Sequence, residues 1–539
     1  MKKNRSEKSV HVLLGVIMAI AVLVYAAVVY YLLSPALNVQ SVKLWLCAMS
    51  VPAFVVLLQG KRIEVKKTGR KGKLRKTYVF TGLQRAMIGI IIVMTALMTV
   101  FFMAGTPLFA WNQYAQVAGN RIENRDFFAD VPEAETVTNI ALMDTASAEI
   151  IGNRQMGSLG NLVSQFEPSQ YSTITMDGKP VKVSALTYVS FFRYLRNNDS
   201  GIPGYIRIDP VTQKAEYVEL ENGMKYVPGA YLQYDLVRHI HMRWPELIVE
   251  DAHFELDDAG NPYYICPWYE PRIAVFSARD VGGAVVVDPV TGAMERYDLE
   301  SIPEWVDYVY NGELLCEQYD WNGLYKNGFW NFSRVGCVVT TEGYGYKSLD
   351  NDIWAFTGVT SVASDESNIG FVLMNCRTGV IRYYDIGGAE EYSAMAAAEG
   401  EVQNLRYTAA FPSVVNVDGS PAYIMVLKDD SGLVKMHALV NVEDYTIVAT
   451  GASQQDAFKA YRSKTGGAAA KYAEEITVCV EDVRYAQLDG NTYVYLISGD
   501  YGYKLSVAED ERSMLIDRGD CVALLVEQSD SEIIRARLK

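Results

Sequence analysis

Three long apolar stretches lie near the start of the chain. Residues 10–33 are 24 residues without a formal charge, enough to cross about 30 Å of hydrocarbon at about 1.5 Å per residue. Residues 44–59 are shorter and contain Pro52, and residues 86–109 are followed by Trp111, whose ring suits the membrane surface. No charged residue lies inside these stretches. The pattern therefore predicts three membrane-spanning helices and argues against a pore or an ion relay.

The basic residues predict the orientation of these helices. Through Trp111 the chain has 15 Lys or Arg and two acidic residues, and nine of the cations lie between Lys61 and Lys76. Two predicted spans separate these nine cations from the basic cluster at 1–8, so both lie on one side of the membrane. Because cytoplasmic loops are enriched in Lys and Arg, we expect a cytoplasmic N-terminus and extracytoplasmic residues after about 111, in a cell membrane. Binding of anionic lipids by the basic loop is compatible with this orientation.

The remainder of the chain is acidic. Residues 112–539 contain 34 basic and 62 acidic residues, a net charge of −28. Because nucleic-acid binding needs clustered cations, we expect no nucleic-acid partner. A well-solvated surface accounts for the charge, and a sensor that binds Ca²⁺ or a small ligand is the alternative.

From residue 169 onward, short β-type runs alternate with turns, and one turn recurs. It reads Asp209-Pro-Val-Thr, then Asp288-Pro-Val-Thr-Gly, then Asn375-Cys-Arg-Thr-Gly. In each turn Asp or Asn can bond the following backbone through its side chain, and Gly in the last two suits a positive φ. Each pattern predicts a β-hairpin.

Two longer stretches share a plan. Residues 230–308 and 389–461 each run through a helix, an aromatic-Pro pair, a strand, an Asp-rich turn, a strand that begins near Pro, a hairpin and a closing helix with an aromatic-x-x-aromatic pattern. The first helices are predicted at 230–243 and 389–405, and the first closing helix falls at 301–308. The shared order indicates internal duplication.

This arrangement resembles a known module. A helix followed by antiparallel strands, with a hairpin such as Asp418-Gly-Ser-Pro-Ala-Tyr423, looks like the PepSY-type modules of bacterial envelope proteins. Three membrane helices before such modules also resemble uncharacterised envelope proteins of Firmicutes. The resemblance covers about 169–461 and rests on turn residues. It implies modules that modulate a peptidase or bind another protein outside the membrane, and it transfers no catalytic residue.

The end of the chain differs from the repeats. Five short strands, with a Gly519-Asp520 turn before the fourth, are typical of a small OB-like or SH3-like barrel. They are predicted at 476–480, 492–497, 503–507, 521–526 and 533–537. Of seven cysteines, most are expected to be buried free thiols, and Cys479 with Cys521 is the pair that could form a disulfide.

The expected fold combines three parts. They are an α-helical anchor with three transmembrane helices, an α+β extracytoplasmic region of antiparallel helix-plus-sheet repeats, and a small C-terminal β-barrel. The expected boundaries are an anchor at 1–111, a connecting segment at 112–168, PepSY-like repeats at 169–300 and at 301–465, and the barrel at 473–539.

The sequence offers few candidates for chemistry. His239, His241 and His253 could in principle supply three metal ligands. On the predicted helix, however, the first two are separated by about 200° of rotation and face apart, so we expect no metal site. The polar cluster Ser364–Asn368 is expected to be a solvated turn. The 36 Tyr and 8 Trp could stack on glycans, although half-buried sheet positions explain them better. We predict no catalytic residue and no cofactor.

The leading functional prediction is a non-catalytic scaffold or binding protein of the bacterial cell envelope. It would present PepSY-like modules to an unknown envelope protein or peptide and contact the lipid bilayer through its anchor. The alternatives are an envelope enzyme acting on peptide or glycan, and a ligand or cation sensor. A cleft lined by convergent acids, or by a histidine with a shifted pKa, would favour an enzyme, whereas flat Tyr-rich sheet faces would favour a binding protein.

Overall fold

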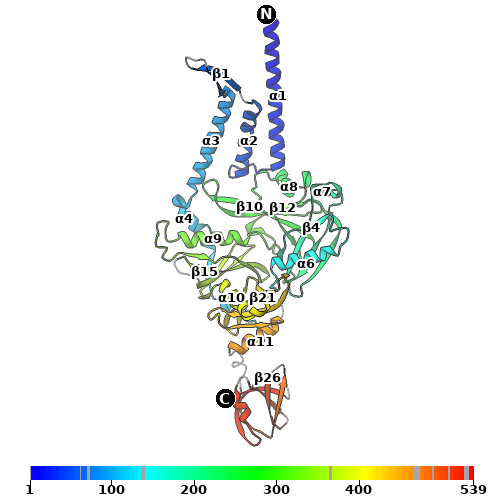
Figure 1. Cartoon of the computed structure of the whole chain (residues 1–539), viewed down its shortest axis with the longest axis vertical. Helices are drawn as coiled ribbons and strands as arrows, with labels where there is room; N and C mark the ends of the chain where they lie inside the picture. The colour runs from blue at the N-terminus through cyan, green and yellow to red at the C-terminus, as the bar shows by residue number, and fades with distance from the viewer. Residues whose placement is uncertain are drawn as a thin grey trace.

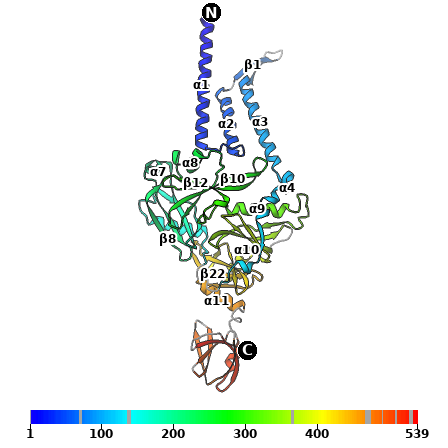
Figure 2. The ribbon, with the colours of Figure 1, turned by 180° about the vertical axis from the view of Figure 1, so that it is seen from behind.

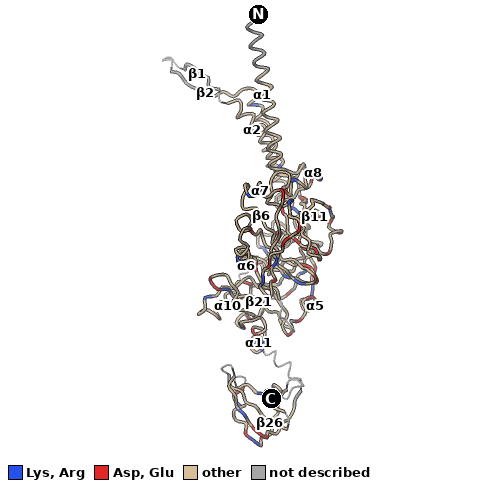
Figure 3. Tube along the Cα trace, turned by 90° about the vertical axis from the view of Figure 1, so that its right-hand side faces the viewer, with Lys and Arg blue, Asp and Glu red and all other residues tan. Residues whose placement is uncertain are grey.

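The molecule is elongated, with long helices at one end and a separate sheet at the other (Figure 1). It was analysed as a computed structural model, which describes the chain over 2–60, 62–68, 73–134, 140–362, 367–465, 474–488, 491–499, 501–507, 510–526 and 533–539. The N-terminus lies at the free end of the helices and the C-terminus in the distal sheet. Charged residues crowd the central β-rich region and are scarce along the described parts of the long helices (Figure 3).

Two helices are long and apolar enough to cross a membrane. They are α1 (Lys2–Leu33), through its segment Gly15–Leu33, and α3 (Gly82–Ala104). Almost none of their apolar surface is buried, which indicates membrane association. Between them lies α2 (Val42–Leu58), an apolar helix of 17 residues that contains Pro52. A third span and the orientation of the helices stay predictions.

The three helices pack against one another. Tyr25 of α1 stacks on Phe54 of α2 with ring centroids 4.0 Å apart. Gln84 of α3 donates to the backbone carbonyls of Val56 and Gly60 at the end of α2. The basic stretch between α2 and α3 forms the antiparallel hairpin of β1 (Arg62–Thr68) and β2 (Lys73–Val79).

The central β-rich region contains four sheets that are antiparallel except for one parallel pair, and a helix precedes the consecutive strands of each. Sheet 1 follows α6 (Thr145–Gly157) and consists of β4 (Phe166–Pro168), β5 (Ser172–Met176), β6 (Lys179–Tyr188), β7 (Ile202–Asp209) and β8 (Lys214–Met224), with α7 (Phe191–Asn197) connecting the antiparallel neighbours β6 and β7. Sheet 2 follows η2 (Leu232–Tyr234) and α8 (Leu236–Arg243) and consists of β9 (His253–Leu256), β10 (Pro262–Ile273), β11 (Ser277–Val287) and β12 (Met294–Asp298).

Sheets 3 and 4 repeat this order. Sheet 3 has seven strands. Six follow α9 (Gly312–Tyr325), namely β13 (Val338–Thr340), β14 (Gly345–Leu349), β15 (Asp352–Ser361), β16 (Ser367–Asn375), β17 (Ile381–Tyr384) and β18 (Gly388–Ala389), and the seventh is β3 (Ile122–Arg125) from earlier in the chain. Sheet 4 follows α10 (Glu391–Glu401) and η4 (Gln403–Leu405), consists of β19 (Thr408–Ala409), β20 (Ser413–Val417), β21 (Ser420–Lys428), β22 (Val434–Asn441) and β23 (Val448–Gly451), and ends at α11 (Gln454–Thr465).

The three predicted hairpin turns are confirmed. The side chains of Asp209, Asp288 and Asn375 each accept hydrogen bonds from the backbone N–H groups two and three residues further on. Gly292 and Gly379 take positive φ angles of 79° and 72°. The turns formed as predicted because their geometry depends on side chains inside the turn itself.

The predicted helices begin or end at different residues. The helix expected at 230–243 begins at Leu236, because Asp235 caps it by accepting from the backbone N–H of Arg238. The closing helix expected at 301–308 is wrong, since after η3 (Leu299–Ser301) this stretch is irregular. Its N–H groups at Asp307 and Tyr308 donate to the carboxylate of Glu255, which replaces the bonds a helix would make.

The stretch expected as a connecting segment, 112–168, is part of the fold. Its first residues complete α4 (Pro107–Val117). They are followed by η1 (Gly119–Arg121) and by β3 (Ile122–Arg125), which pairs with β17 in parallel. Further on it forms α5 (Phe127–Asp130), α6 and β4. Figure 2 shows α3 continuing into α4, which lies beside α9.

Neighbouring sheets share apolar cores. Ile206 of sheet 1, Val285 of sheet 2 and Ile353 of sheet 3 belong to one buried cluster. Phe371 of sheet 3 and Tyr423 of sheet 4 belong to a second, and their rings lie 5.8 Å apart. The four sheets therefore form a continuous stack, with each sheet using its neighbour to exclude water.

The C-terminal sheet has six strands, one more than predicted. It consists of β24 (Glu474–Cys479), β25 (Asp482–Leu488), β26 (Asn491–Ser498), β27 (Tyr501–Ser506), β28 (Cys521–Val526) and β29 (Ile533–Leu538), in the order β24-β28-β29-β27-β26-β25. Cys479 and Cys521 form a disulfide between β24 and β28. Cys266, Cys337 and Cys376 are buried free thiols, as expected. The barrel class stays a prediction.

Candidate functional site at the helical end

The tip of the β10–β11 hairpin packs among the long helices. Phe276 lies there with its ring centroid 6.2 Å from Trp45, 6.0 Å from Phe101 and 4.9 Å from Phe102. The end of α3 approaches so closely that a Cβ at Gly105 would overlap the side chain of Ser277. Sheet 2 is thus docked directly against α2 and α3.

Hydrogen bonds continue this contact along the α1–α2 connection. Leu37 N–H donates to the carbonyl of Pro245 at 2.5 Å, Asn38 Nδ2 to the carbonyl of Glu246 at 3.2 Å, and Gln40 Nε2 to the carbonyl of Pro271 at 3.2 Å. These partners follow α8 or end β10. We call these contacts, together with the Phe276 cluster, the helix–sheet interface.

A second set of contacts joins α4 to α9. Tyr114 donates its hydroxyl to the carbonyl of Gly105 at 2.8 Å and packs edge-on against Trp321, with centroids 5.0 Å apart. Asn322 Nδ2 donates to the carbonyl of Ala115 at 2.7 Å. Arg121 then donates to Gln318 Oε1 at 2.6 Å. These contacts fix the path by which the chain leaves α3 and enters the sheets.

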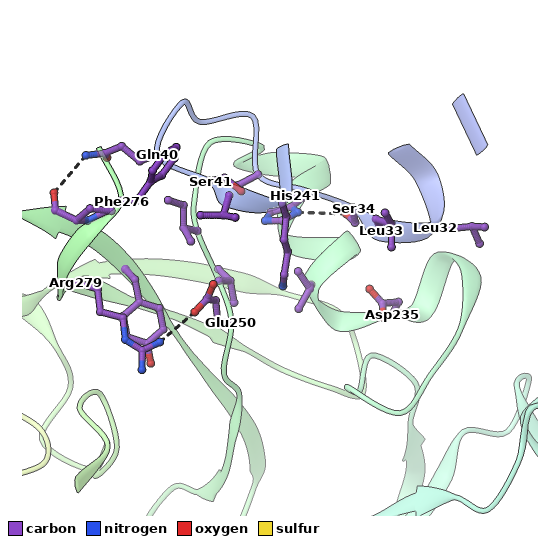
Figure 4. A pocket seen from close by; sticks show the side chains of 18 residues that line it. Leu32, Leu33, Ser34, Gln40, Ser41, Asp235, His241, Glu250, Phe276 and Arg279 are labelled. Carbon is purple, nitrogen blue, oxygen red and sulfur yellow. Dashed lines mark hydrogen bonds and ion pairs between the residues drawn. The ribbon is translucent and has the colours of Figure 1, made fainter. Parts of the chain in front are cut away.

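A pocket of about 390 Å³ lies between the α1–α2 connection and sheet 2. Leu32, Leu33 and Phe276 contribute apolar walls, while Lys43, Asp235, His241, Glu250 and Arg279 contribute charge and hydrogen-bonding groups (Figure 4). A second hollow of about 280 Å³ shares Gln40, Ile248, Tyr269 and Pro271 with it. The mixture of apolar and charged walls is typical of a binding site for a polar or amphiphilic group.

The charges in the pocket are partly satisfied by one another. Arg279 Nη1 lies 3.2 Å from Glu250 Oε2, and its guanidinium lies over the ring of Tyr269, 5.2 Å from the centroid. Asp235 accepts the N–H of Arg238 as the cap of α8. Lys43 is exposed at the start of α2.

Ser34 and His241 form a hydrogen-bonded pair in the pocket. The Ser34 Oγ lies 3.2 Å from His241 Nδ1, and His241 Nε2 lies 2.9 Å from the carbonyl of Leu247. Because the carbonyl can only accept, Nε2 carries the proton and the Ser34 hydroxyl donates to Nδ1. Burial lowers the pKa of His241, so its ring is neutral at pH 7.

A serine bonded to a neutral histidine is the pairing that nucleophilic catalysis requires. Here the surroundings oppose that chemistry. Ser34 follows the C-terminal end of α1, where the free carbonyls disfavour a developing negative charge. The next residue is Pro35, which has no N–H to offer an oxyanion. The φ of Ser34 is 38°, a left-handed conformation that ends α1 just before Pro35. The Ser34–His241 hydrogen bond is therefore best explained as a link between α1 and α8.

The histidines considered as metal ligands have separate partners. His239 Nε2 lies 2.8 Å from the carbonyl of Gly292, and His253 stacks on Tyr308 with centroids 5.3 Å apart. Over the part of the chain that the structure describes, no group of three or more His, Cys, Asp or Glu is placed to hold a metal. In the polar cluster at 364–368, Ser364 to Glu366 lie outside the described residues. Asn368 is buried, not solvated, and donates to the hydroxyl of Tyr423 at 3.1 Å.

Glu255 and Asp307 form a buried carboxyl pair that the sequence pattern did not predict. Glu255 and Asp307 are 0% and 1% exposed. The Glu255 carboxylate accepts the N–H groups of Asp307 and Tyr308, each at 2.8 Å, while Asp307 Oδ2 accepts the N–H of Thr175 at 2.6 Å. Burial raises the pKa of Glu255 to about 7, and burial together with the Glu255 charge raises the pKa of Asp307 well above its usual range. The pair joins sheets 1 and 2 and lines neither pocket.

Comparisons with known proteins identify no family. No family model and no curated protein matches the chain. Among solved structures, a Trypanosoma rangeli sialidase in complex with 2-keto-3-deoxy-D-glycero-D-galacto-2,3-difluoro-nononic acid is 10% identical, with a TM-score of 0.13, and the match covers 69% of this chain and 52% of that chain. The chain therefore spans about half the length of that sialidase. A TM-score this low carries no argument about fold or activity.

Proposed function

We propose that the chain is a membrane-anchored, non-catalytic scaffold of the bacterial cell envelope that presents PepSY-like modules outside the membrane to a protein or peptide partner. The helix–sheet interface carries this proposal. The aromatic cluster around Phe276 and the hydrogen bonds of Leu37, Asn38 and Gln40 hold sheet 2 against the ends of the long helices. A simple tether would need none of these contacts, whereas a scaffold needs its binding surface at a fixed position and angle.

Several features support the finer parts of the proposal. Sheets 1 to 4 each follow a helix, and the turns opened by Asp209, Asp288 and Asn375 have a fourth counterpart at Asn441, whose side chain accepts the N–H of Asp444. This recurrence favours duplicated modules. A disulfide at Cys479 favours an oxidising compartment, in line with an extracytoplasmic C-terminal part. In this arrangement α2 is the third span.

The edge strand β8 is the surface that we assign to the partner. β8 is 11 residues long and pairs only with β7 among the described strands, so its other edge is open to a further strand. Glu219 and Glu221 are exposed on it and have no ion pair among the described residues. An extended peptide with basic side chains would complete the backbone hydrogen bonds and meet these carboxylates.

The test is photo-crosslinking in native cells. A photoreactive residue at position 219 of the full chain should capture a basic partner segment, and capture should fall when Glu221 is replaced by lysine. Gly105→Ala should also reduce capture, because its methyl group displaces Ser277 and weakens the helix–sheet interface. Gly89→Ala, on a residue of α3 with open space around it, is the matched control and should leave capture unchanged.

Two results would contradict the proposal. If neither Glu221→Lys nor Gly105→Ala changed the capture, β8 would not be the partner surface and binding would not depend on the helix–sheet interface. Hydrolysis of peptide or glycan by the purified chain, abolished by a single carboxylate substitution, would favour the enzyme alternative.

A further inference from the structure

An apolar surface lies beside the outer end of α1, on α7, on α8 and on the segment that leads into α8. Phe192 and Met242 are 79% and 70% exposed, and Phe191, Leu195 and Leu232 are each more than a third exposed. Figure 1 places α7 and α8 next to the end of α1 that meets the β-rich region. Exposing a phenylalanine ring to water is unfavourable. Several exposed apolar side chains in one place therefore indicate a surface that an apolar partner covers.

This surface is continuous with the lipid-facing side of α1. The Arg238 guanidinium lies 4.3 Å from the ring centroid of Tyr31 and donates through Nε to the Tyr31 carbonyl at 3.0 Å. Tyr31 is in the last turn of α1, where Leu32 and Leu33 are 63% and 59% exposed. Arg238 thus holds α8 against the last turn of α1. A lipid environment that covers Leu32 and Leu33 would therefore also reach α8.

The surface is held in place by its own packing. Tyr194 of α7 donates its hydroxyl to the carbonyl of Tyr231 at 2.6 Å. The ring of Tyr231 lies 5.0 Å from that of Phe191 and 5.3 Å from that of Tyr194. Phe192, one residue further along α7, contacts Phe191 edge-on with ring centroids 6.0 Å apart and leaves most of its own surface exposed. The exposed rings are thus displayed by a fixed element.

The charges around the surface suit a layer of lipid headgroups. The helices α7 and α8 contain four arginines, at Arg193, Arg196, Arg238 and Arg243, and no Asp or Glu. This is unusual in a region whose overall charge is strongly negative. Arginine beside exposed aromatic residues can reach lipid phosphates while the apolar side chains enter the boundary below them.

We propose that α7 and α8 lie on the membrane leaflet from which α1 emerges, with Phe192 and Met242 inserted between the lipids and the arginines at the phosphates. The β-rich region then contacts the membrane at the helical anchor and at this second point. Two such points fix its tilt, so the sheets face the membrane at one angle. This inference rests on the membrane anchor of the proposed function and is independent of the partner.

The test uses tryptophan quenching in the full chain reconstituted into vesicles of phosphatidylcholine and phosphatidylglycerol, with and without bromine on the acyl chains. Phe192→Trp should add fluorescence that brominated vesicles quench. Leu515→Trp is the matched control, since Leu515 is 80% exposed, as Phe192 is 79% exposed, but lies in the distal C-terminal part. Its added fluorescence should be the same in both kinds of vesicle.

A third variant separates failure of the inference from failure of the anchor. Leu97→Trp, on the exposed side of α3, should be quenched if that helix spans the bilayer. Quenching at 97 without quenching at 192 would overturn the leaflet contact and leave the anchor intact. Absence of quenching at both positions would overturn the anchor, and the inference with it. Quenching at 515 as strong as at 192 would also overturn the inference, because the signal would not be specific to α7.

Discussion

Replacing Asp307 by asparagine and replacing Glu255 by glutamine should each remove part of a pH dependence of stability that the buried carboxyl pair creates. Glu255 accepts two backbone N–H groups and Asp307 accepts one, so a negative charge is better stabilised on Glu255. When the pair holds a single proton, that proton is therefore on Asp307. The pKa of Glu255 is raised to about 7 from the ordinary value of 4.5. A shift of this size corresponds to roughly 3 kcal/mol at about 1.4 kcal/mol per unit.

The sign follows from which state binds the proton. A raised carboxyl pKa means that the folded state holds protons more tightly than the unfolded state does. The stabilisation is fully present below about pH 4.5, and it is lost as the pH rises to about 7, with no further loss from Glu255 above that. Asparagine at 307 resembles the protonated acid, since its carbonyl can still accept the N–H of Thr175, and it carries no charge at any pH.

The assay is guanidinium unfolding of the full chain in detergent micelles at pH 5, 6, 7 and 8. The difference between wild type and Asp307→Asn cancels titrations elsewhere, and we expect the variant to gain on wild type as the pH rises across this range, because burial and the Glu255 charge raise the pKa of Asp307 and asparagine does not ionise. Glu255→Gln removes the titration of Glu255, so its difference from wild type should change by about 3 kcal/mol as the pH rises from 5 to 8. At low pH the variant should be less stable by about 1–3 kcal/mol, because its amide nitrogen would face a backbone N–H. A difference between wild type and Asp307→Asn that does not change with pH would refute the reasoning.

Three further predictions concern the interface, an ion pair and the disulfide. Phe276→Ala should weaken the helix–sheet interface by roughly 1–3 kcal/mol, seen as faster hydrogen exchange at the β10–β11 tip, and unchanged exchange there would contradict the packing described. Asp352→Asn should cost about 3 kcal/mol in chemical unfolding because it leaves Arg377 without its 2.8 Å bidentate partner, and a cost near zero would show that the pair is solvated. Cys479→Ser opens a 42-residue loop and should destabilise the C-terminal sheet by about 4 kcal/mol, so proteolysis should cut it at lower denaturant concentration; equal resistance would contradict a structural disulfide.

Local features were predictable from the sequence because their causes are local. The turns at Asp209, Asp288 and Asn375 form because a side chain bonds the backbone two or three residues away, and the sequence shows both partners. The apolar character of α1 and α3 is likewise visible residue by residue. The same holds for the pairing of Cys479 with Cys521, which the strand positions brought into one small sheet.

Features that depend on distant residues were missed. The helix expected at 301–308 does not form, because Glu255, about fifty residues earlier, takes the N–H groups of that stretch. The pairing of β3 with β17 joins residues far apart in the chain, so 112–168 looked like a connector. Phe276 gave no signal of its role at the helix–sheet interface, since its partners lie on α2 and α3. Pattern alone shows which residues are apolar but not which surfaces meet.

The central claim is that long helices anchor this chain and that everything after about 111 lies outside the cell membrane. Alkaline phosphatase, which is active only after export, and green fluorescent protein, which fluoresces in the cytoplasm, can each be fused after Lys539 and compared in the same cells. The account predicts an active phosphatase fusion and a dark fluorescent-protein fusion. An inactive phosphatase with a bright fluorescent fusion would place the sheets in the cytoplasm and contradict it.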